Sequence, residues 1–579
     1  MSFAQVDDIK VDVDHVEVQG GPPPAETHIH VAGAEKPPSV VKTGLALIAL
    51  AMTFGSQLGV GCNMAPSVLS QIAADFDATP LQGWISSGWL LSTCVAFIVA
   101  GRLSDIFGRR IIITSSNVLA IIGYAMCAVT SDYSVFVGGV IIQGFAGGLA
   151  QTATAAACEI VPNKYRPVAI AFLELGIAPT GYLSGSTFAH LIVYYSTWRW
   201  IHRLGIILCS IAFFLCVAFY KPPPPVYHLG KSRMQLLRDL DYVGIGLFSS
   251  GLGVFLMGVI WAGGQYPSRD LHVIVPIVIG LVTLVSFGFW QVFLGDKALM
   301  PPRLFKGKTK TRTFTLPIVV HMVAGTVFFG QIAIWPLQSA YFYASDLLEV
   351  GVLGLPAGVA VFVGGCVIGP FIPKLGPTNR QLLIAITLMV ASIASMAALS
   401  PTSKAAAIAL QVLCNLPFHV IVNLCFLSVG FAQDDADVGI AVGLCGAGRS
   451  FGGCIAVSIY LTILGSWIPE ELPPAIAGAV SSSGLSASTT SALIALLMSG
   501  NVTGAAGLPG MTDAILQQAI AGMNLGYQRC FKVVYLSTLG FGVFGILAAY
   551  FVLDASHHFT NHTAVSLSRG EDEILEEKV

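Results

Sequence analysis

The sequence has very little charge. Of its 579 residues only 10% are charged while 55% are hydrophobic, and the formal net charge at pH 7 is −2. There is no basic stripe with interleaved aromatic residues, so the charge pattern excludes nucleic acid as a partner. The apolar surface also exceeds what a soluble fold of this length would bury against itself. Lipid is therefore the predicted solvent for most of the chain.

The sequence also lacks the motifs of membrane enzymes and of metal or cofactor sites. It has no paired histidine-rich boxes, no nucleophile elbow and no P-loop. Its twelve cysteines include no CxxC pair, and eleven of them fall in apolar windows, which indicates small membrane-core residues rather than a disulfide framework. We expect no catalytic residues, no metal and no cofactor. A membrane sensor or enzyme is kept as a remote alternative.

Long hydrophobic runs are what the sequence has in abundance. About 20 apolar residues cross a hydrocarbon core of roughly 30 Å, and fourteen such windows follow one another. A further apolar stretch, 485–498, is short and rich in serine and threonine, so we assign it to a loop. The predicted fold is all-α integral membrane with about 14 transmembrane helices. The predicted spans lie near 44–64, 81–100, 111–129, 134–156, 167–191, 201–220, 241–262, 271–294, 314–336, 349–372, 379–399, 405–430, 438–464 and 531–553.

Two basic linkers divide the spans into six, two and six. This spacing predicts two six-helix bundles joined by a two-helix hairpin, although no repeat of residue identity supports it. The predicted parts are a disordered cytosolic tail (1–42), an N-terminal six-helix bundle (43–220), linkers with two extra transmembrane helices (221–313), a C-terminal six-helix bundle (314–553) with a long outer loop (465–530), and an acidic cytosolic tail (554–579).

Lysine and arginine are distributed unequally over the predicted loops. Seventeen fall on the side of the N-terminus, and six fall on the opposite side and its flanks. Because positive residues concentrate on the cytosolic side of membrane proteins, both termini are predicted to be cytosolic. The sequon that begins at Asn501 then lies in the outer loop, where we predict glycosylation. The sequon at Asn561 would face the cytosol and stay unmodified.

A compact motif, GRLSDIFGRR, stands between the second and third predicted spans. Two glycines bracket a predicted tight cytosolic turn, Asp105 can accept hydrogen bonds or pair with an arginine, and the arginines face anionic headgroups. A turn that only orients the helices would account for the presence of the arginines. It would not account for the two glycines and the aspartate at their spacing. We therefore interpret the motif as a conformational loop. Its functional residues are Gly101, Arg102, Asp105, Gly108, Arg109 and Arg110.

This decapeptide resembles the loop signature of the major facilitator superfamily. Two segments flanking the first bundle's helices are similar to the fourteen-span drug:proton antiporters of that superfamily, and three further segments resemble its fungal branch of trichothecene efflux pumps and siderophore-iron transporters. The resemblance covers roughly residues 44–568. The five segments are 82–91, 197–201, 240–245, 299–305 and 559–565.

The resemblance implies proton-coupled transport of a small organic substrate across a fungal plasma membrane by a multi-pass chain, which we expect to be a monomer. Export of a toxin, secondary metabolite or drug is the leading interpretation, and uptake of a ferric siderophore is the alternative. One departure concerns coupling. Efflux members often carry an arginine three residues before a Gln-Gly pair; that pair is Gln143-Gly144 here, and the arginine's place is taken by Val140. Proton coupling must therefore depend on other residues or be weak.

Two ionisable residues fall inside predicted spans, Glu174 in the fifth and Arg449 in the thirteenth. Each costs several kcal/mol when it faces lipid, so each should face the bundle interior or a cavity. If the two bundles correspond helix by helix, both lie on equivalent fifth helices beside the central pathway. Both are candidates for proton coupling. The alternatives are a structural hydrogen bond for Glu174 and an interhelical strut for Arg449.

Small residues and a proline recur in the fifth span, where they approximate the antiporter signature. Glycines at such intervals permit close helix approach, and Pro179 removes a backbone donor and can bend the helix at the interface between the bundles. A gating role and a static packing role both fit. The candidate gating residues are Gly176, Pro179, Gly181 and Gly185.

Aromatic side chains can supply the flat apolar walls that a bulky organic substrate needs. Interfacial anchoring explains those at span ends equally well, so we assign substrate contact only to Phe328 and Phe329. Four polar residues inside the second bundle either line the cavity or are satisfied core positions, and we favour the core position for each: His321, Asn415, His419 and Asn423.

We predict that Asp105→Ala lowers transport more than it lowers abundance, because a hinge needs the carboxylate during conformational change whereas a simple turn does not. Transport by cells is to be normalised to the amount of protein at the surface, measured by biotinylation. An equal loss of both quantities would return the motif to a purely structural turn.

Overall fold

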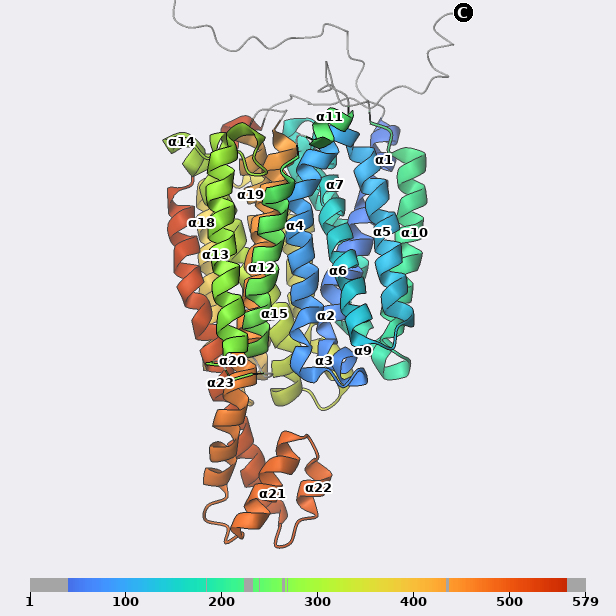
Figure 1. Ribbon diagram of the computed structural model, residues 1–579. Helices are drawn as coiled ribbons and strands as arrows, with labels where there is room; N and C mark the ends of the chain where they lie inside the picture. The colour runs from blue at the N-terminus through green and yellow to red at the C-terminus, as the bar shows by residue number, and fades with distance from the viewer. Residues whose placement is uncertain are drawn as a thin grey trace, which may run out of the picture. The chain divides into compact units, whose positions relative to one another are not determined.

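The computed structural model of the protein describes residues 40–183, 185–222, 233–238, 240–262, 266–267, 269–433 and 437–559, and every regular element within them is helical. Fourteen helices in these ranges are long and apolar enough to cross a membrane (Figure 1). The predicted all-α membrane fold is confirmed. The predicted tails lie outside the described residues, except for their ends next to the first and last spans.

The first six spans form one bundle. Within it the first span packs on the fifth and sixth, and the fourth packs between the second and third. The first and fifth spans change helix type along their length, and the fourth is divided into two α-helices at Gln151. The elements are α1 (Val40–Gln57), η1 (Leu58–Met64) and α2 (Ala65–Ser67); α4 (Gly83–Phe107); α5 (Arg109–Val129); α6 (Tyr133–Ala150) and α7 (Thr152–Glu159); α8 (Arg166–Ile177), η4 (Ala178–Tyr182) and α9 (Gly185–Tyr195); and α10 (Arg199–Phe219).

The last six spans form the second bundle, in which the first span packs on the fifth and sixth. Glycine and proline residues interrupt the second span of this bundle, which is built from four short helical pieces. The elements are α15 (Leu316–Phe342); α16 (Leu347–Leu353), α17 (Leu355–Phe362), η9 (Val363–Ile368) and η10 (Gly369–Lys374); α18 (Thr378–Ser395); α19 (Lys404–Phe431); α20 (Val438–Ala479); and α23 (Asp513–Phe551).

A helical hairpin, α12 (Tyr242–Ala262) and α13 (Leu271–Leu294), connects the bundles. It lies beside the line where they meet, because α12 packs on both α4 and α20 (Figure 1). The buried Asp241 carboxylate anchors its first turn by accepting hydrogen bonds from Gly244 N at 2.7 Å and from Trp290 Nε1 and Gln291 Nε2 at 2.8 Å. Asp241 is therefore a structural carboxylate.

The bundles meet through two pairs of spans. On one side α4 runs along α20, with Ser87 and Ser458 hydroxyls 2.9 Å apart and the Cys94 thiol donating to Ala447 O. On the other side α8 and α9 meet η10 and α16. The second span of each bundle thus packs on the fifth span of the other, which is the pairing expected of two bundles related by a two-fold axis.

The segment predicted as a long outer loop is helical instead. Helix α20 has 42 residues and α23 has 39, which at 1.5 Å per residue makes each about 60 Å long, roughly twice a hydrocarbon core. Both extend past the other helices and carry between them α21 (Ala487–Met498), the apolar stretch assigned to the loop, and α22 (Val502–Ala506) (Figure 1). The apolar character of each sequence ends at the first polar turns, but the backbone hydrogen bonding of the helix continues beyond them. The end of a membrane span therefore need not be the end of a helix.

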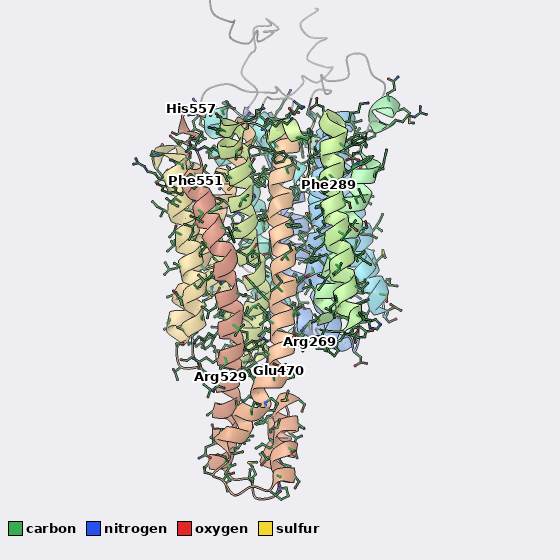
Figure 2. All side chains as sticks on the ribbon, turned by 60° about the vertical axis from the view of Figure 1, so that its left-hand side comes forward. Arg269, Phe289, Glu470, Arg529, Phe551 and His557 are labelled. Carbon is green, nitrogen blue, oxygen red and sulfur yellow. The ribbon has the colours of Figure 1, made fainter. Side chains whose placement is uncertain are left out.

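Charged residues mark the place where these two helices leave the apolar layer. Figure 2 shows Glu470 and Arg529 at this level, and Arg529 Nη1 lies 3.3 Å from Glu471 Oε2 between the two helices. The ion pair is exposed and adds little stability on its own, but it identifies the helical extension as a water-facing part of the chain.

The short segment Asp554–Phe559 follows α23 and packs on α18 and α19 of the second bundle. Asp554 Oδ1 accepts hydrogen bonds from the Thr378 backbone N–H and hydroxyl, each at 2.8 Å. Burial opposes ionisation, but hydrogen bonds from Ser556 and Thr378 outweigh it and hold the pKa of Asp554 below its usual range. The His558 ring stacks on Phe431 of α19 at 5.4 Å between centroids, and Arg166 of α8 lies 5.4 Å from the same ring.

We predict that Asn501, which is exposed at the start of α22, carries an N-linked glycan. Asn501→Gln should abolish the mass shift caused by an endoglycosidase, whereas Asn561→Gln should leave it unchanged. A tag at either terminus should be protected in intact cells. Labelling of an N-terminal tag from outside would show that the orientation is reversed.

Candidate functional site

Two adjoining cavities lie between the bundles. The larger, here called the amide cavity, holds about 560 Å³ of space not filled by atoms, including the part open to solvent, and the smaller, the arginine cavity, holds about 350 Å³. The two share Asn63, Tyr182 and Phe328.

Both bundles contribute to each cavity wall. The amide cavity is lined by Asn63, Ser67, Gly181, Tyr182, Ser186, Phe328, Gln331, Ile332, Trp335, Pro336, Gly354, Ala357, Gly358, Val361, Gln411 and Asn415. The arginine cavity is lined by Leu58, Cys62, Asn63, Trp89, Thr93, Gln151, Tyr182, Phe328, Phe329, Phe418, His419, Arg449 and Ser450.

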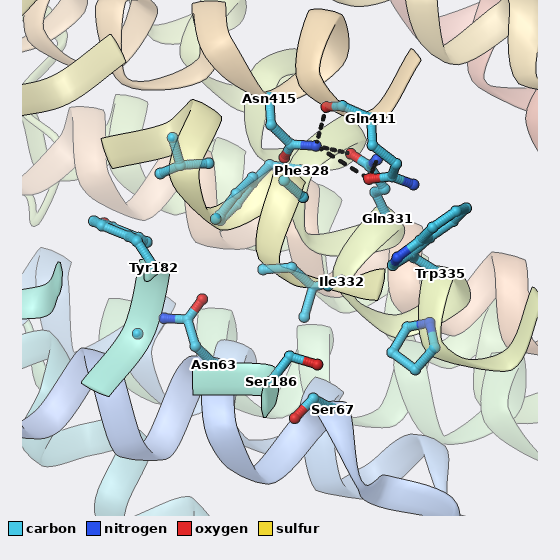
Figure 3. A pocket seen from close by; sticks show the side chains of 16 residues that line it. Asn63, Ser67, Tyr182, Ser186, Phe328, Gln331, Ile332, Trp335, Gln411 and Asn415 are labelled. Atoms are coloured by element: carbon cyan, nitrogen blue, oxygen red, sulfur yellow. Dashed lines mark hydrogen bonds between the residues drawn. The ribbon is translucent and has the colours of Figure 1, made fainter. Parts of the chain in front are cut away.

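Three buried amides form one wall of the amide cavity (Figure 3). Asn415 Nδ2 donates to Gln331 Oε1 at 3.0 Å and to the Gln411 carbonyl at 2.8 Å, and Gln331 Nε2 donates to Gln411 Oε1. Figure 3 shows Asn63 and other polar side chains of the first bundle facing them. A molecule in the cavity would therefore meet polar groups from both bundles.

The carboxylate of Glu174 lies beside the arginine cavity, and its side chain is only 3% exposed. Tyr182 Oη donates to Glu174 Oε2 at 2.7 Å, and His419 Nδ1 lies 3.2 Å from the same oxygen. Glu174 and Tyr182 belong to the fifth span, whereas His419 belongs to α19. The contact thus joins an acid of one bundle to a base of the other.

His419 was interpreted from the sequence as a core position, and its pairing was missed. A signal for it existed: Gln411, Asn415, His419 and Asn423 recur every fourth residue, which places them on one face of α19. The first three of these line one or other cavity, and the fourth is fully buried. A polar stripe on a membrane helix was the available evidence for a cavity.

Arg449 is 4% exposed and lines the arginine cavity with His419. Among the described residues its Nε has no hydrogen-bond acceptor, which argues against an interhelical strut. Its guanidinium lies 6.0 Å from the Phe426 ring and acts electrostatically on Glu174. Among the described residues that line the two cavities, Arg449 is the one group with a permanent charge, so a cation would be repelled there.

Phe328 and Phe329, the two residues assigned to substrate contact, both line a cavity. Phe328 stacks on Phe418 at 3.7 Å between ring centroids and lies between the two cavities. Trp89 and Trp335, for which the sequence left wall and anchor equally open, also line them. The indole N–H of Trp335 is bound to Leu353 O at 2.9 Å.

Of the predicted gating residues, Gly176 and Gly181 approach the first bundle's own first span, and Gly181 also lines the amide cavity between the bundles. A Cβ on Gly176 would lie 2.1 Å from Ala51 O, and one on Gly181 would lie 3.3 Å from the Gly59 Cα. Pro179 begins the π-helical turn η4, which carries Tyr182. Such π-turns are frequent at functional sites, and this one positions the phenol against Glu174.

The loop motif differs from the predicted tight turn. Helix α4 continues through Gly101 to Phe107, because a lone glycine does not end a helix, and only Gly108, with φ of 88°, makes the turn. Gly101 instead permits close packing, since a Cβ there would lie 2.9 Å from Gly439 O of α20. The side chain of Asp105 lies outside the described part of the structure.

The motif's arginines hold neighbouring elements together. Arg109 binds the Glu159 carboxylate at the end of α7 through two nitrogens, a bidentate arrangement that is stronger than a single hydrogen bond. Arg102 Nη2 donates to Ala298 O at 3.1 Å, beyond the hairpin. Arg110 Nη2 donates to Val217 O at 2.6 Å. The motif thus connects α4 and α5 to three other parts of the chain.

Two bundles with crossed pairing of their second and fifth spans, enclosing cavities that carry buried ionisable groups, define a transporter of the major facilitator superfamily. Solved structures share this fold. The human organic anion transporter MFSD10 matches with a TM-score of 0.50 and 13% identity over 88% of this chain and 98% of its own. The proton:xylose symporter XylE matches with a TM-score of 0.50 and 14% identity over 90% of this chain and 98% of its own.

The chain belongs to the fungal trichothecene efflux pump family, whose model matches residues 35–574. The trichothecene efflux pump of Fusarium sporotrichioides is 26% identical over 504 residues, which are 86% of this chain and 83% of that protein. The MFS-type transporter prx5 of Penicillium rubens is 27% identical over 452 residues, 78% of this chain and 82% of that protein. The family resemblance is confirmed, and the protein is a membrane transporter of small organic compounds in a family of efflux pumps.

We predict that Gly176→Ala destabilises the protein, because the added methyl would meet the backbone carbonyl of Ala51, which cannot rotate away. Overpacking of this kind costs about 1–3 kcal/mol. The measurement is the thermal unfolding midpoint in detergent. Gly44→Ala in α1 is the matched control, because nothing lies within 4 Å of a Cβ there; equal midpoints for the two variants would contradict the close approach.

Proposed function

We propose that the protein is a proton-coupled efflux pump that exports a small organic compound, a secondary metabolite or toxin, across a fungal plasma membrane as a monomer with both termini in the cytosol. The observation that carries the proposal is the contact between Glu174 and His419, at 3.2 Å, across the two bundles and beside the cavities. The names of the relatives, trichothecene efflux pump and MFS-type transporter, support export of fungal products.

Protonation of this pair changes the force between the bundles. With Glu174 ionised and His419 protonated, opposite charges attract across the contact in a medium of low dielectric. A proton taken up by Glu174 removes that attraction, so the two halves are then held by apolar packing alone at this point. A proton can shift a conformational equilibrium only if its binding free energy differs between the two conformations. The contact between Glu174 and His419 provides such a difference, because it exists only while the two bundles meet at this point.

Tyr182 links the proton to the substrate. Its hydroxyl donates to Glu174 at 2.7 Å, and its side chain lines both cavities. A molecule that fills either cavity contacts this ring and alters the hydrogen bond that favours the ionised carboxylate. Binding in the cavity and protonation of Glu174 are therefore coupled through one side chain, as antiport requires.

Uptake of a ferric siderophore on the same scaffold is the competing function. The match of residues 35–574 to a family of efflux pumps favours export. Val140 stands where efflux members often carry an arginine, but this does not weaken the case for export. The buried Glu174 and His419 supply an ionisable pair elsewhere in the contact between the bundles.

We predict that Glu174→Gln retains substrate binding but abolishes transport against a gradient and flattens its pH dependence, because glutamine keeps the size of the side chain and fixes the neutral state. His419→Gln should flatten the pH dependence likewise. The measurement is transport by purified protein in liposomes under imposed pH gradients. Glu349→Gln, which removes a carboxylate paired with Lys404 away from the cavities, is the control.

Concentrative transport by Glu174→Gln with the pH profile of the unmodified protein would contradict the assignment of proton coupling to Glu174. The proton site would then have to be sought at Glu159, the carboxylate paired with Arg109.

A further inference from the structure

The three amides of the amide cavity take no part in the proton contact, yet they are among the most completely buried polar groups of the chain. We propose that Gln331, Gln411 and Asn415 are the specificity-determining residues of transport, and that they select an uncharged molecule by the oxygen atoms on its otherwise apolar skeleton. The proposal rests on the proposed function in one respect, that the amide cavity holds the transported compound.

The amides come from two helices that face each other. Gln411 and Asn415 lie one turn apart on α19, and Gln331 lies opposite on α15. None of the three is more than 3% exposed. Their mutual bonds hold them in place: Asn415 Nδ2 bridges Gln331 Oε1 and the Gln411 carbonyl, and Gln331 Nε2 donates to Gln411 Oε1. The polar wall is therefore rigid before any ligand arrives.

The mutual bonds use only part of the hydrogen-bonding capacity of these amides. Each side-chain amide has two N–H donors and a carbonyl with two lone pairs. The bond to Gln411 employs one N–H of Gln331, and among the described residues Gln411 Nε2 meets no acceptor at all. A buried polar group without a partner is unfavourable by about 1–3 kcal/mol, so an occupant that supplies polar atoms to this wall relieves that cost.

The rest of the cavity limits what the occupant can be. The described residues of its lining include no charged side chain, and Phe328, Ile332, Trp335 and Val361 form apolar surfaces. Trp335 offers only its ring, because its N–H is bound to Leu353. An ion would lose its hydration without gaining a counter-charge, and a hydrocarbon would leave the amides unpaired. An uncharged molecule with hydroxyl, carbonyl or ether oxygens can hydrogen-bond to the amides and pack its apolar skeleton against the apolar surfaces.

Sites that hydrogen-bond a ligand discriminate strongly against an analogue without the polar atom, whereas apolar pockets discriminate weakly. The amide wall therefore decides which compounds of similar size and shape are accepted. Removal of an amide should weaken binding of the oxygenated member of a matched series and not that of the hydrocarbon.

The test uses the purified full chain in detergent and a rigid series on one skeleton: 5α-androstane-3,17-dione, 5α-androstan-17-one and 5α-androstane. Dissociation constants are compared for each ligand between the unmodified protein and a variant, so that partition of the ligand into detergent cancels. Gln411→Met and Asn415→Leu, which keep the side-chain volume approximately, should each weaken binding of the dione about tenfold and leave or strengthen binding of androstane.

Gln338→Met is the matched control. Gln338 is a buried amide on the same helix as Gln331. Its Oε1 accepts from Tyr535 and, like that of Gln411, its Nε2 meets no acceptor among the described residues, but it lines neither cavity. This variant should keep the binding of all three ligands. If either α19 variant fails to fold, Gln331→Met tests the same wall from α15.

Equal effects of the cavity variants on dione and androstane would overturn the proposal, and so would an unmodified protein that binds none of the three compounds or binds them without regard to oxygen. The outcome is independent of the proton mechanism, because binding is measured without a gradient. Loss of proton coupling in Glu174→Gln with an unchanged preference for oxygen, or the reverse, separates failure of one proposal from failure of the other.

Discussion

A carboxylate in the interior of a membrane protein constrains everything around it. An ionised Glu174 needs partners, since the bilayer offers none, and the structure supplies them from both halves of the chain: Tyr182 from its own span and His419 from α19. Neither bundle alone balances this charge. The two halves therefore meet at this carboxylate, and elsewhere they meet through apolar packing and hydrogen bonds such as that between Ser87 and Ser458.

Segments that depart from regular α-helix geometry surround Glu174 and its partners. The π-helical segment η1 contributes Cys62 and Asn63 to the cavities, and η4 contributes Tyr182. A third, η9, contains Gly365, where a Cβ would lie 3.1 Å from His419 and 3.7 Å from Glu174. Each π-turn widens the helix and shifts the phase of its side chains. Three spans around the cavities thus give up regular hydrogen bonding, whereas α15, α19 and α20 present their polar groups from regular α-helix.

The sequence predicted the parts of the structure that depend on polarity averaged along the chain. Fourteen spans and their order followed from apolar windows, and Glu174 and Arg449 were recognised because charge is rare in such windows. The predictions that failed are those that depend on which residues lie close together in space. Partnership of Glu174 with His419 joins residues far apart in sequence, and the packing of Gly101 on Gly439 is invisible without the fold. The extended ends of α20 and α23 were missed because a helix in water carries no hydropathy signal.

Segment Asp554–Phe559, the last described part of the chain to be synthesised, covers a ring of the second bundle that the first bundle also approaches. Segment Asp554–Phe559 follows all fourteen spans, yet His558 covers the Phe431 ring against which Arg166 of the fifth span packs. Helix α19 carries the Phe431 ring, Arg166 of the first bundle approaches it, and His558 can cover it only after all fourteen spans have been synthesised. A chain that ended before residue 554 would keep all fourteen spans but would leave this ring without its His558 cover at a point where the first bundle meets the second.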